Sequence, residues 1–192
     1  MIPSLPPLIL ASISPRRQEL LREMQVAFQV ISSDVTELHQ EHLTARELSL
    51  VNAYRKARAV SKRFPDHLVL AADTLVYLGT RLFGKPSNRL EAFTMLTDLS
   101  GQTHQVITGV SLVHLRTHRQ ILFSETTFVT FQKLTEAQIR NYLNAVDTLD
   151  KAGAYAIQER GGEIISGIDG SYSNVVGLPV ERLRAEFEAW GA

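Results

Sequence analysis

The chain contains no cysteine, which excludes disulfide bonds, thiolate catalysis and Cys-ligated zinc. Any metal must therefore be held by oxygen or imidazole ligands. The sequence also lacks a run of about 18 apolar residues, the length needed to span a bilayer. Residues 1–10 have neither a basic stretch nor a small-residue cleavage site, so no secretory signal is expected and we predict a cytosolic protein with no membrane partner.

Net charge is also absent, because 20 Lys and Arg residues balance 20 Asp and Glu residues. No global positive field attracts a polyanion, so a nucleic-acid polymer is disfavoured as a partner. Local basic clusters would suit a small anionic ligand better. The 192 residues can bury a substantial core in one domain but would be cramped as two independent ones, so we predict a single domain over 1–192.

The hydrophobic pattern alternates between the periods of strands and helices. It predicts strands over 8–12, 67–73, 104–115 and 119–132, a short hairpin over 74–86, and helices over 15–24, 44–63, 88–99, 135–146 and 179–189. Strands and helices interleave, yet the last two strands form a long hairpin. The predicted fold class is therefore α/β with a mixed sheet and flanking helices.

A glycine-dense segment at 150–179 holds six of the 11 glycines. It is too rich in Ile, Val and Tyr for a disordered tether. We expect its backbone to make close approaches in a cleft.

The segment "GTRLFGKP" at 79–86 almost matches a phosphate-binding P-loop, which requires Ser or Thr after the lysine. Pro86 offers no hydroxyl to magnesium and keeps Lys85 out of a helical conformation. The P-loop is thus excluded. Lys85 remains a phosphate-binding candidate close in sequence to Asp73, with a solvated turn lysine as the alternative.

A second candidate site is the junction between the first strand and the first helix. Here "SISPRR" places Ser12, Ser14, Arg16 and Arg17 at a helix N-terminus, where free N–H groups and the helix dipole attract anions. Two surface arginines on an amphipathic helix are the alternative.

Asp73 follows the apolar run "LVLAA", so a carboxylate is predicted at the end of a buried strand, where ligands gather in α/β sheets. A buried charge needs an ion pair, hydrogen bonds or a metal. Capping of the turn through Thr74 is the structural alternative. Glu37 and Lys56 individually resemble an acid in a polar loop and a lysine on a solvated helix face.

Four ordered blocks give the chain a resemblance to the Maf family of nucleoside triphosphate pyrophosphatases. The blocks are "LILASISPRRQELL", "AADTLVYLGTRLFGKP", "GQTHQVITGVSL" and "DKAGAYAIQERGGEIISGIDGSYSNVVGLPVERL". The resemblance implies the architecture of inosine triphosphate pyrophosphatases (Maf/Ham1): an elongated mixed sheet with flanking helices and a cleft between two lobes that share the sheet. It also suggests a homodimer.

The activity implied by the resemblance is hydrolysis of a nucleoside triphosphate to the monophosphate and pyrophosphate, with a divalent cation, Mg²⁺ or Mn²⁺. Arg16, Thr74 and Gln158 match the branch that acts on dTTP and UTP, with modified pyrimidine triphosphates as further candidate substrates. The other branch has Trp in the first block and "SDQ" in the second, and this chain has neither. A nucleotide-binding regulator of septum formation that does not hydrolyse its ligand is the alternative.

Site residues implied by the resemblance fall into three groups. Ser12, Ser14, Arg16, Lys56 and Lys85 would bind phosphates, Glu37 and Asp73 would hold the metal, and Asp73 would activate water, directly or through metal-bound hydroxide. The chain departs from the family pattern in reading Asp34-Val-Thr-Glu37 where a tighter acidic pair is common. It also has Asn52 where Ala is common before the lysine.

Overall fold

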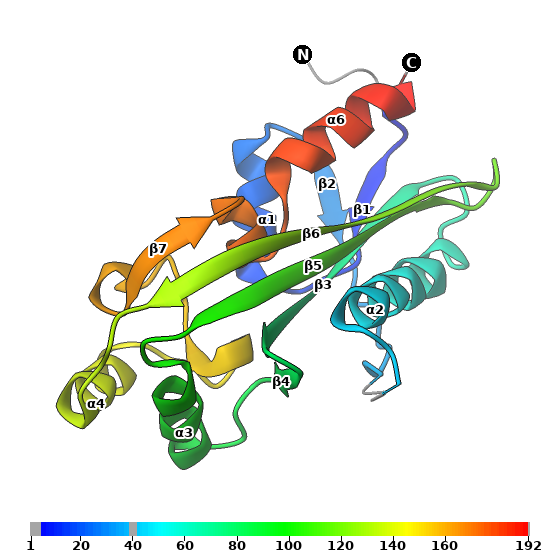
Figure 1. Cartoon of the computed structure of the whole chain (residues 1–192). Helices are drawn as coiled ribbons and strands as arrows, with labels where there is room; N and C mark the ends of the chain where they lie inside the picture. Colours follow the sequence, from blue (N-terminus) through cyan, green and yellow to red (C-terminus); the bar gives the residue numbers. More distant parts are fainter. Residues whose placement is uncertain (1–4, 39–41, 192) are drawn as a thin grey trace. The chain divides into compact units, whose positions relative to one another are not determined.

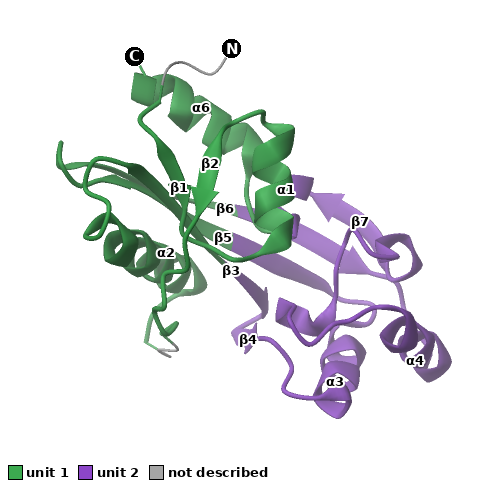
Figure 2. Cartoon of the chain, turned by 180° about the vertical axis from the view of Figure 1, so that it is seen from behind, with its two compact units in different colours: residues 1–73, 108–125, 177–192 green, residues 74–107, 126–176 purple. Residues whose placement is uncertain are grey.

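The computed structural model describes residues 5–38 and 42–191, which form two compact units. Unit 1 comprises residues 1–73, 108–125 and 177–192, and unit 2 comprises residues 74–107 and 126–176 (Figure 2). The strands are β1 (Leu8–Leu10), β2 (Phe28–Val30), β3 (Leu68–Leu78), β4 (Arg81–Phe83), β5 (Thr103–His114), β6 (Arg119–Phe131) and β7 (Ile165–Asp169). The helices are α1 (Pro15–Glu23), α2 (Ala45–Ser61), α3 (Arg89–Leu99), α4 (Glu136–Ala145), α5 (Tyr172–Val176) and α6 (Val180–Gly191), with 3-10 turns η1 (Ala152–Ala154) and η2 (Gly161–Glu163).

In unit 1 the strand order is β2-β1-β3-β5-β6, and β1 pairs in parallel with both β2 and β3. Helix α2 covers one face of these strands, while α1 and α6 lie on the other (Figure 1). The α2 face buries alternate strand residues against the helix, namely Ile9, Ala11, Val69, Ala71 and Val113 against Ala57 and Val60. Leu8, Leu10, Leu68 and Leu70 point the other way and are also buried. Burial on both faces explains the continuous apolar runs in the sequence.

Helix α2 begins where the sequence predicts. The Thr44 side chain accepts a hydrogen bond from the Glu47 backbone N–H, and the Glu47 carboxylate accepts from the Thr44 N–H at 2.9 Å. This capping box satisfies two backbone donors that would otherwise lack partners at the helix start. The helix is 17 residues long and carries Asn52 and Lys56, which both contact Asp73 of β3.

In unit 2 the continuing strands run β3-β5-β6-β7, and β4 pairs antiparallel with β3. Strand β7 also pairs antiparallel, with β6, and has a register shift between Thr130 and Phe131. One apolar cluster joins these strands to α3 and α4, and it includes Phe83, Leu96, Leu99, Phe131 and Tyr142. Both helices begin within one residue of the predicted start and are capped, α3 by Asn88 and α4 by Thr135.

The structure confirms the α/β class with a mixed sheet, and one local prediction was wrong. Asp73 does not end a strand, because β3 continues through it to Leu78. The first part of β3 pairs with β1 at 68–70 and the last part with β4 at 76–78, so Asp73 lies where the pairing partner changes. Strands β2 and β7 and helix α5 were not predicted, and the last two lie in the glycine-dense segment. Across the described residues, no helix is long and apolar enough to cross a bilayer.

Candidate active site

Asp73 lies on the α2 face of β3, because side chains alternate along a strand and Val69 and Ala71 already pack against that helix. Its side chain is only 4% exposed. The Lys56 ammonium lies 2.7 Å from Asp73 Oδ1 and donates to it. The buried carboxylate predicted from the sequence is therefore present, and its partner is a lysine from the helix that covers it.

The same Lys56 ammonium also contacts Glu37, at 2.6 Å from Oε1. Glu37 is more open than Asp73, with 39% of its side chain exposed. One cation thus holds two carboxylates from distant parts of the chain. A buried ion pair costs desolvation energy that its Coulomb attraction only partly repays, so such a cluster points to a role other than stability.

Asn52 precedes Lys56 by one helical turn on the same face of α2. Its Oδ1 accepts from the Leu38 N–H at 2.8 Å, and its Nδ2 donates to the Leu38 carbonyl at 3.2 Å. The same Nδ2 donates to Asp73 Oδ2, also at 3.2 Å. Both oxygens of Asp73 therefore have a fixed donor. This contact was not predicted, because Asn52 stands out in the sequence only as a departure from the family pattern.

Arg17 is a residue for which the sequence left two roles open, anion binding or exposure on the surface of the helix. Its Nη1 donates to Ser12 Oγ at 3.2 Å and its Nε donates to the Gly177 carbonyl at 2.8 Å. Burial lowers the pKa of Arg17, and the negative charges of Asp73 and Glu37 oppose that shift. The guanidinium thus belongs to the electrostatic surroundings of the two carboxylates.

The first turn of α1 has the features of an anion site. Pro15 occupies the start of the helix, as predicted, and the first turn holds no acidic residue. The N-cap residue Ser14 makes no side-chain capping hydrogen bond, while its backbone N–H donates to Ser12 Oγ. Arg16 is half-buried in the same turn. Arg17 links this turn to the Glu37, Lys56, Asp73 group in unit 1, because the charges of Asp73 and Glu37 act on its guanidinium.

The remaining predicted residues belong to unit 2. Thr74 follows Asp73 in β3 and is half-buried. Lys85 is exposed in the connection between β4 and α3. The preceding Gly84 carbonyl accepts from the Gly153 N–H at 3.0 Å, which ties this connection to the glycine-dense segment. The phosphate-binding role of Lys85 stays a prediction.

Gln158 is exposed in a turn of the glycine-dense segment. The buried Tyr142 hydroxyl fixes this turn, since it accepts from the Ala156 N–H at 3.0 Å and lies 3.3 Å from the carbonyls of Ala156 and Glu159. Burial raises the pKa of Tyr142 to about 12. The hydroxyl therefore remains a donor throughout the physiological range and holds the backbone on both sides of Gln158.

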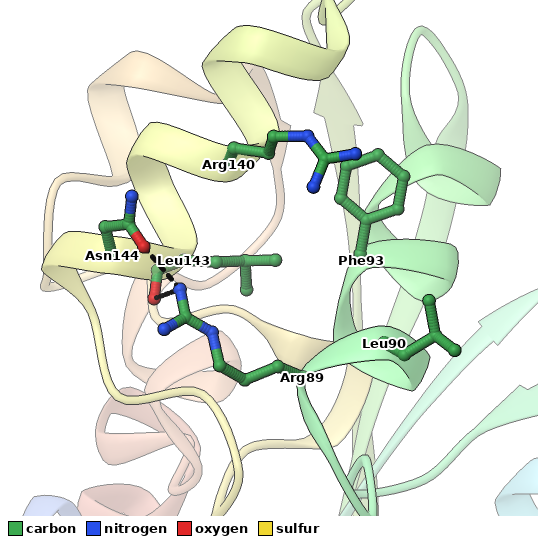
Figure 3. A pocket seen from close by; sticks show the side chains of 6 residues that line it. All are labelled: Arg89, Leu90, Phe93, Arg140, Leu143 and Asn144. Atoms are coloured by element: carbon green, nitrogen blue, oxygen red, sulfur yellow. Dashed lines mark hydrogen bonds between the residues drawn. The ribbon is translucent and has the colours of Figure 1, made fainter.

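A pocket of about 410 Å³ lies between α3 and α4 in unit 2 (Figure 3). Its lining residues are Arg89, Leu90, Phe93, Arg140, Leu143 and Asn144. Both guanidinium groups are already engaged: Arg89 donates to the Leu143 carbonyl and to Asn144 Oδ1, and Arg140 lies over the Phe93 ring. No carboxylate, imidazole or hydroxyl is among the side chains of these lining residues, so they include no general base to activate water.

Comparison with known proteins now decides the family. The family model described as "Maf-like protein" matches residues 7–190. The chain belongs to the Maf family. The earlier resemblance is thereby confirmed over nearly its whole length.

Curated relatives of this Maf protein cover almost the full chain. A protein of Akkermansia muciniphila named "dTTP/UTP pyrophosphatase" is 47% identical over 176 residues, 92% of each chain. Proteins with the same name from Carboxydothermus hydrogenoformans and Desulforamulus reducens are 43% and 42% identical, over 95% and 96% of this chain and 97% of each relative.

Solved structures confirm the expected fold type for this Maf protein. The Ham1 protein of Staphylococcus aureus aligns with a TM-score of 0.54 at 16% identity, covering 95% of this chain and 98% of that one. A HAM1 protein from Coxiella burnetii aligns with a TM-score of 0.52 at 13% identity, covering 96% and 100%. At such identities the likeness concerns the fold alone.

Proposed function

We propose that this Maf protein is a nucleoside triphosphate pyrophosphatase that hydrolyses dTTP and UTP to the monophosphate and pyrophosphate. The observation that carries the proposal is the Lys56 ammonium bound to both Glu37 and Asp73 in the same unit as the arginine-rich turn of α1. The names of relatives 42–47% identical to it support the reaction and the pyrimidine substrates.

Each group in unit 1 has a role that phosphoryl transfer requires. Negative charge spreads over the phosphoryl oxygens in the transition state, and cations placed beforehand stabilise it. Lys56, Arg16 and the N-terminal turn of α1 supply positive charge, while Ser12 and Ser14 supply hydroxyl donors. Lys85 is proposed as a further phosphate-binding cation.

Asp73 is assigned to the attacking water. Its carboxylate is buried and fixed by Lys56 and Asn52, so its remaining lone pairs keep a constant direction. A carboxylate held in this way can accept a proton from water without first reorganising its own hydrogen bonds.

A divalent cation, Mg²⁺ or Mn²⁺, is proposed as the cofactor. Within the described part of the chain, no group of three or more His, Cys, Asp or Glu side chains forms a ready cation site. Mg²⁺ often takes only one or two protein carboxylates and completes its shell with phosphate oxygens and water. Glu37 and Asp73 fit that pattern, so the cation would enter with the triphosphate. Once bound, it would polarise a phosphoryl oxygen and neutralise charge.

Pyrimidine specificity is assigned to Arg16, Thr74 and Gln158. The Gln158 amide offers both a donor and an acceptor, which complements the carbonyl and N–H edge of uracil or thymine. The rigid turn around it, fixed by Tyr142, reduces the entropy lost when the base binds. Modified pyrimidines that keep this edge are further candidate substrates.

The deciding experiment is a panel of nucleoside triphosphates assayed with Mg²⁺ or Mn²⁺ for release of pyrophosphate. We expect dTTP and UTP to be cleaved fastest, with the monophosphate as the second product. Release of inorganic phosphate would overturn the reaction type, and a preference for purines would overturn the specificity. Binding without turnover would favour a regulatory nucleotide-binding protein.

Family likeness also supports a homodimer in the cytoplasm, acting on a small-molecule triphosphate. Sedimentation equilibrium of the purified protein at micromolar concentration tests the oligomeric state. A mass of 21.4 kDa, that of one chain, would contradict the dimer.

A further inference from the structure

Asn52 of α2 hydrogen-bonds both to the backbone next to Glu37 and to the Asp73 carboxylate. It is 2% exposed, and its amide makes three hydrogen bonds, two to the Leu38 backbone and one to Asp73. Leu38 directly follows Glu37. Asn52 therefore joins the segment that carries one carboxylate to the side chain of the other.

The orientation of this amide follows from its partners. Leu38 presents an N–H on one side, which only an oxygen can accept, and a carbonyl on the other, which needs a donor. A flipped amide would face donor with donor and acceptor with acceptor. The backbone of Leu38 thus determines that the Nδ2 group, with its two N–H bonds, points to Asp73.

We propose that Asn52 is a positioning residue, which fixes the Asp73 carboxylate and the Glu37 segment as one rigid unit around Lys56. This inference rests on the proposed function and adds a determinant of its geometry. Both Asp73 oxygens are held, one by Lys56 and the other by Asn52, so the plane of the carboxylate is fixed. Catalytic groups lose much of their effect when misplaced by about 1 Å.

Helix α2 provides a matched control. Arg55 also anchors the same segment, because its Nη1 donates to the Thr36 carbonyl at 2.9 Å. This hydrogen bond is to the backbone, one residue before Glu37, and not to Asp73. Asn52→Leu keeps the side-chain size and removes the contacts to Leu38 and Asp73. Arg55→Gln weakens only the attachment of the segment that carries Glu37 and leaves the contact to Asp73 in place.

The first test compares the steady-state kinetics of both variants, on whichever triphosphate the wild-type protein cleaves. Since outer-sphere contacts of this kind typically affect activity by 10–100-fold, we expect Asn52→Leu to lower kcat by about 10–100-fold with KM within about threefold of wild type. Arg55→Gln should change kcat by less than about threefold. Wild-type turnover decides the proposed function on its own, whereas the ratio between the variants decides the role of Asn52.

A second measurement does not depend on turnover. Mn²⁺ is titrated into protein saturated with the α,β-methylene analogue of dTTP, and free Mn²⁺ is followed by electron paramagnetic resonance. We expect Mn²⁺ to bind about tenfold more weakly to Asn52→Leu and within about twofold of wild type to Arg55→Gln. If Asn52→Leu does not fold, Asn52→Ser replaces it under the same criteria. Equal effects of the Asn52 and Arg55 variants, or a wild-type kcat in Asn52→Leu, would overturn the inference.

Discussion

Gly109 lies against the backbone of Ser49, and a Cβ atom added to Gly109 would stand 2.4 Å from the Ser49 carbonyl carbon and 2.7 Å from the Leu50 nitrogen. Neither backbone atom can move without shifting α2, the helix that carries Asn52 and Lys56. The absence of a side chain at this point of β5 therefore sets how closely the helix packs on the sheet.

Replacing Gly109 with Ala should lower the free energy of unfolding by about 2–3 kcal/mol, because the core of unit 1 would be overpacked. Urea unfolding followed by circular dichroism measures it. Gly167→Ala is the control, since a Cβ there meets no atom within 4 Å. Its stability should remain within about 0.5 kcal/mol of wild type. Equal stability of the two variants would contradict close packing at Gly109.

Asp73→Asn should lower kcat for dTTP by at least about a hundredfold, because the amide cannot take a proton from water. Binding of the triphosphate should be largely retained, as measured by calorimetry. Asp66→Asn is the control: Asp66 is an exposed carboxylate of unit 1 that pairs with Arg116, and its loss should not change turnover. Undiminished pyrophosphate release by Asp73→Asn would refute the catalytic assignment.

Lys56→Met should destabilise the protein by about 3 kcal/mol, because it leaves the buried Asp73 carboxylate without its cation. Chemical denaturation gives the difference. Adding Asp73→Asn to this variant should restore part of the lost stability, since the uncompensated charge is then removed. Lys62→Met, an exposed change just beyond the same helix, should have little effect. A double variant no more stable than Lys56→Met would show that the ion pair is not the cause.

His104 should make stability depend on pH below neutrality. It is 1% exposed, its Nε2 lies 2.8 Å from the Tyr155 hydroxyl, and burial lowers its pKa to about 4 from the ordinary 6.5. Between pH 6.5 and about pH 4, His104 is protonated in the unfolded chain but largely neutral in the folded protein. Stability due to this residue is therefore full above pH 6.5 and declines as pH falls toward 4, by about 1.4 kcal/mol per pH unit.

Urea unfolding of wild type and His104→Gln between pH 5 and pH 7, about the window in which this linkage acts, checks the prediction. The glutamine can still bond to the Tyr155 hydroxyl but does not titrate. The free-energy difference between the two proteins should shift with pH in the variant's favour as the solution becomes more acidic. A difference that stays constant over this range would contradict it.

Tyr142→Phe should cost about 1–2 kcal/mol, because the turn groups at Ala156 lose a buried hydrogen-bond partner. The same variant should raise KM for dTTP more than it lowers kcat, since the turn holding Gln158 becomes looser. Thermal unfolding and initial rates measure both effects. Tyr172→Phe, an exposed hydroxyl, serves as the control. If KM stays unchanged, Tyr142 does not position a substrate-binding turn.

Local signals in the sequence predicted much of the fold. Thr44 with Glu47 and Thr135 with Gln138 form the capping boxes that the spacing indicates, because a cap depends only on residues within one turn. Strand β7 escaped prediction because Gly167 and a register shift opposite Thr130 break its alternation. Its pairing with β6 is a long-range contact that no local pattern records.

The residues of the candidate site could be predicted from the sequence, but most of the contacts between them could not. Asp73 and Lys56 could be selected, but their pairing depends on which face of β3 meets α2. Arg16 and Arg17 are chemically identical neighbours, and the helix phase relative to the sheet determines that Arg17 bonds to Ser12 and the Gly177 carbonyl. The role of Asn52 could not be predicted from the sequence, because it bonds to the backbone of Leu38, and every residue offers the same backbone groups.

The contact between Arg17 and the Gly177 carbonyl limits when unit 1 can finish folding during translation. Unit 1 is assembled from the beginning, the middle and the end of the chain, so a ribosome has already synthesised all of unit 2 before residues 177–192 emerge. Since domains fold as units during synthesis, unit 1 can reach its final packing only when translation is nearly complete. Nascent chains stalled before Gly177 should therefore be inactive, however long they are given to fold.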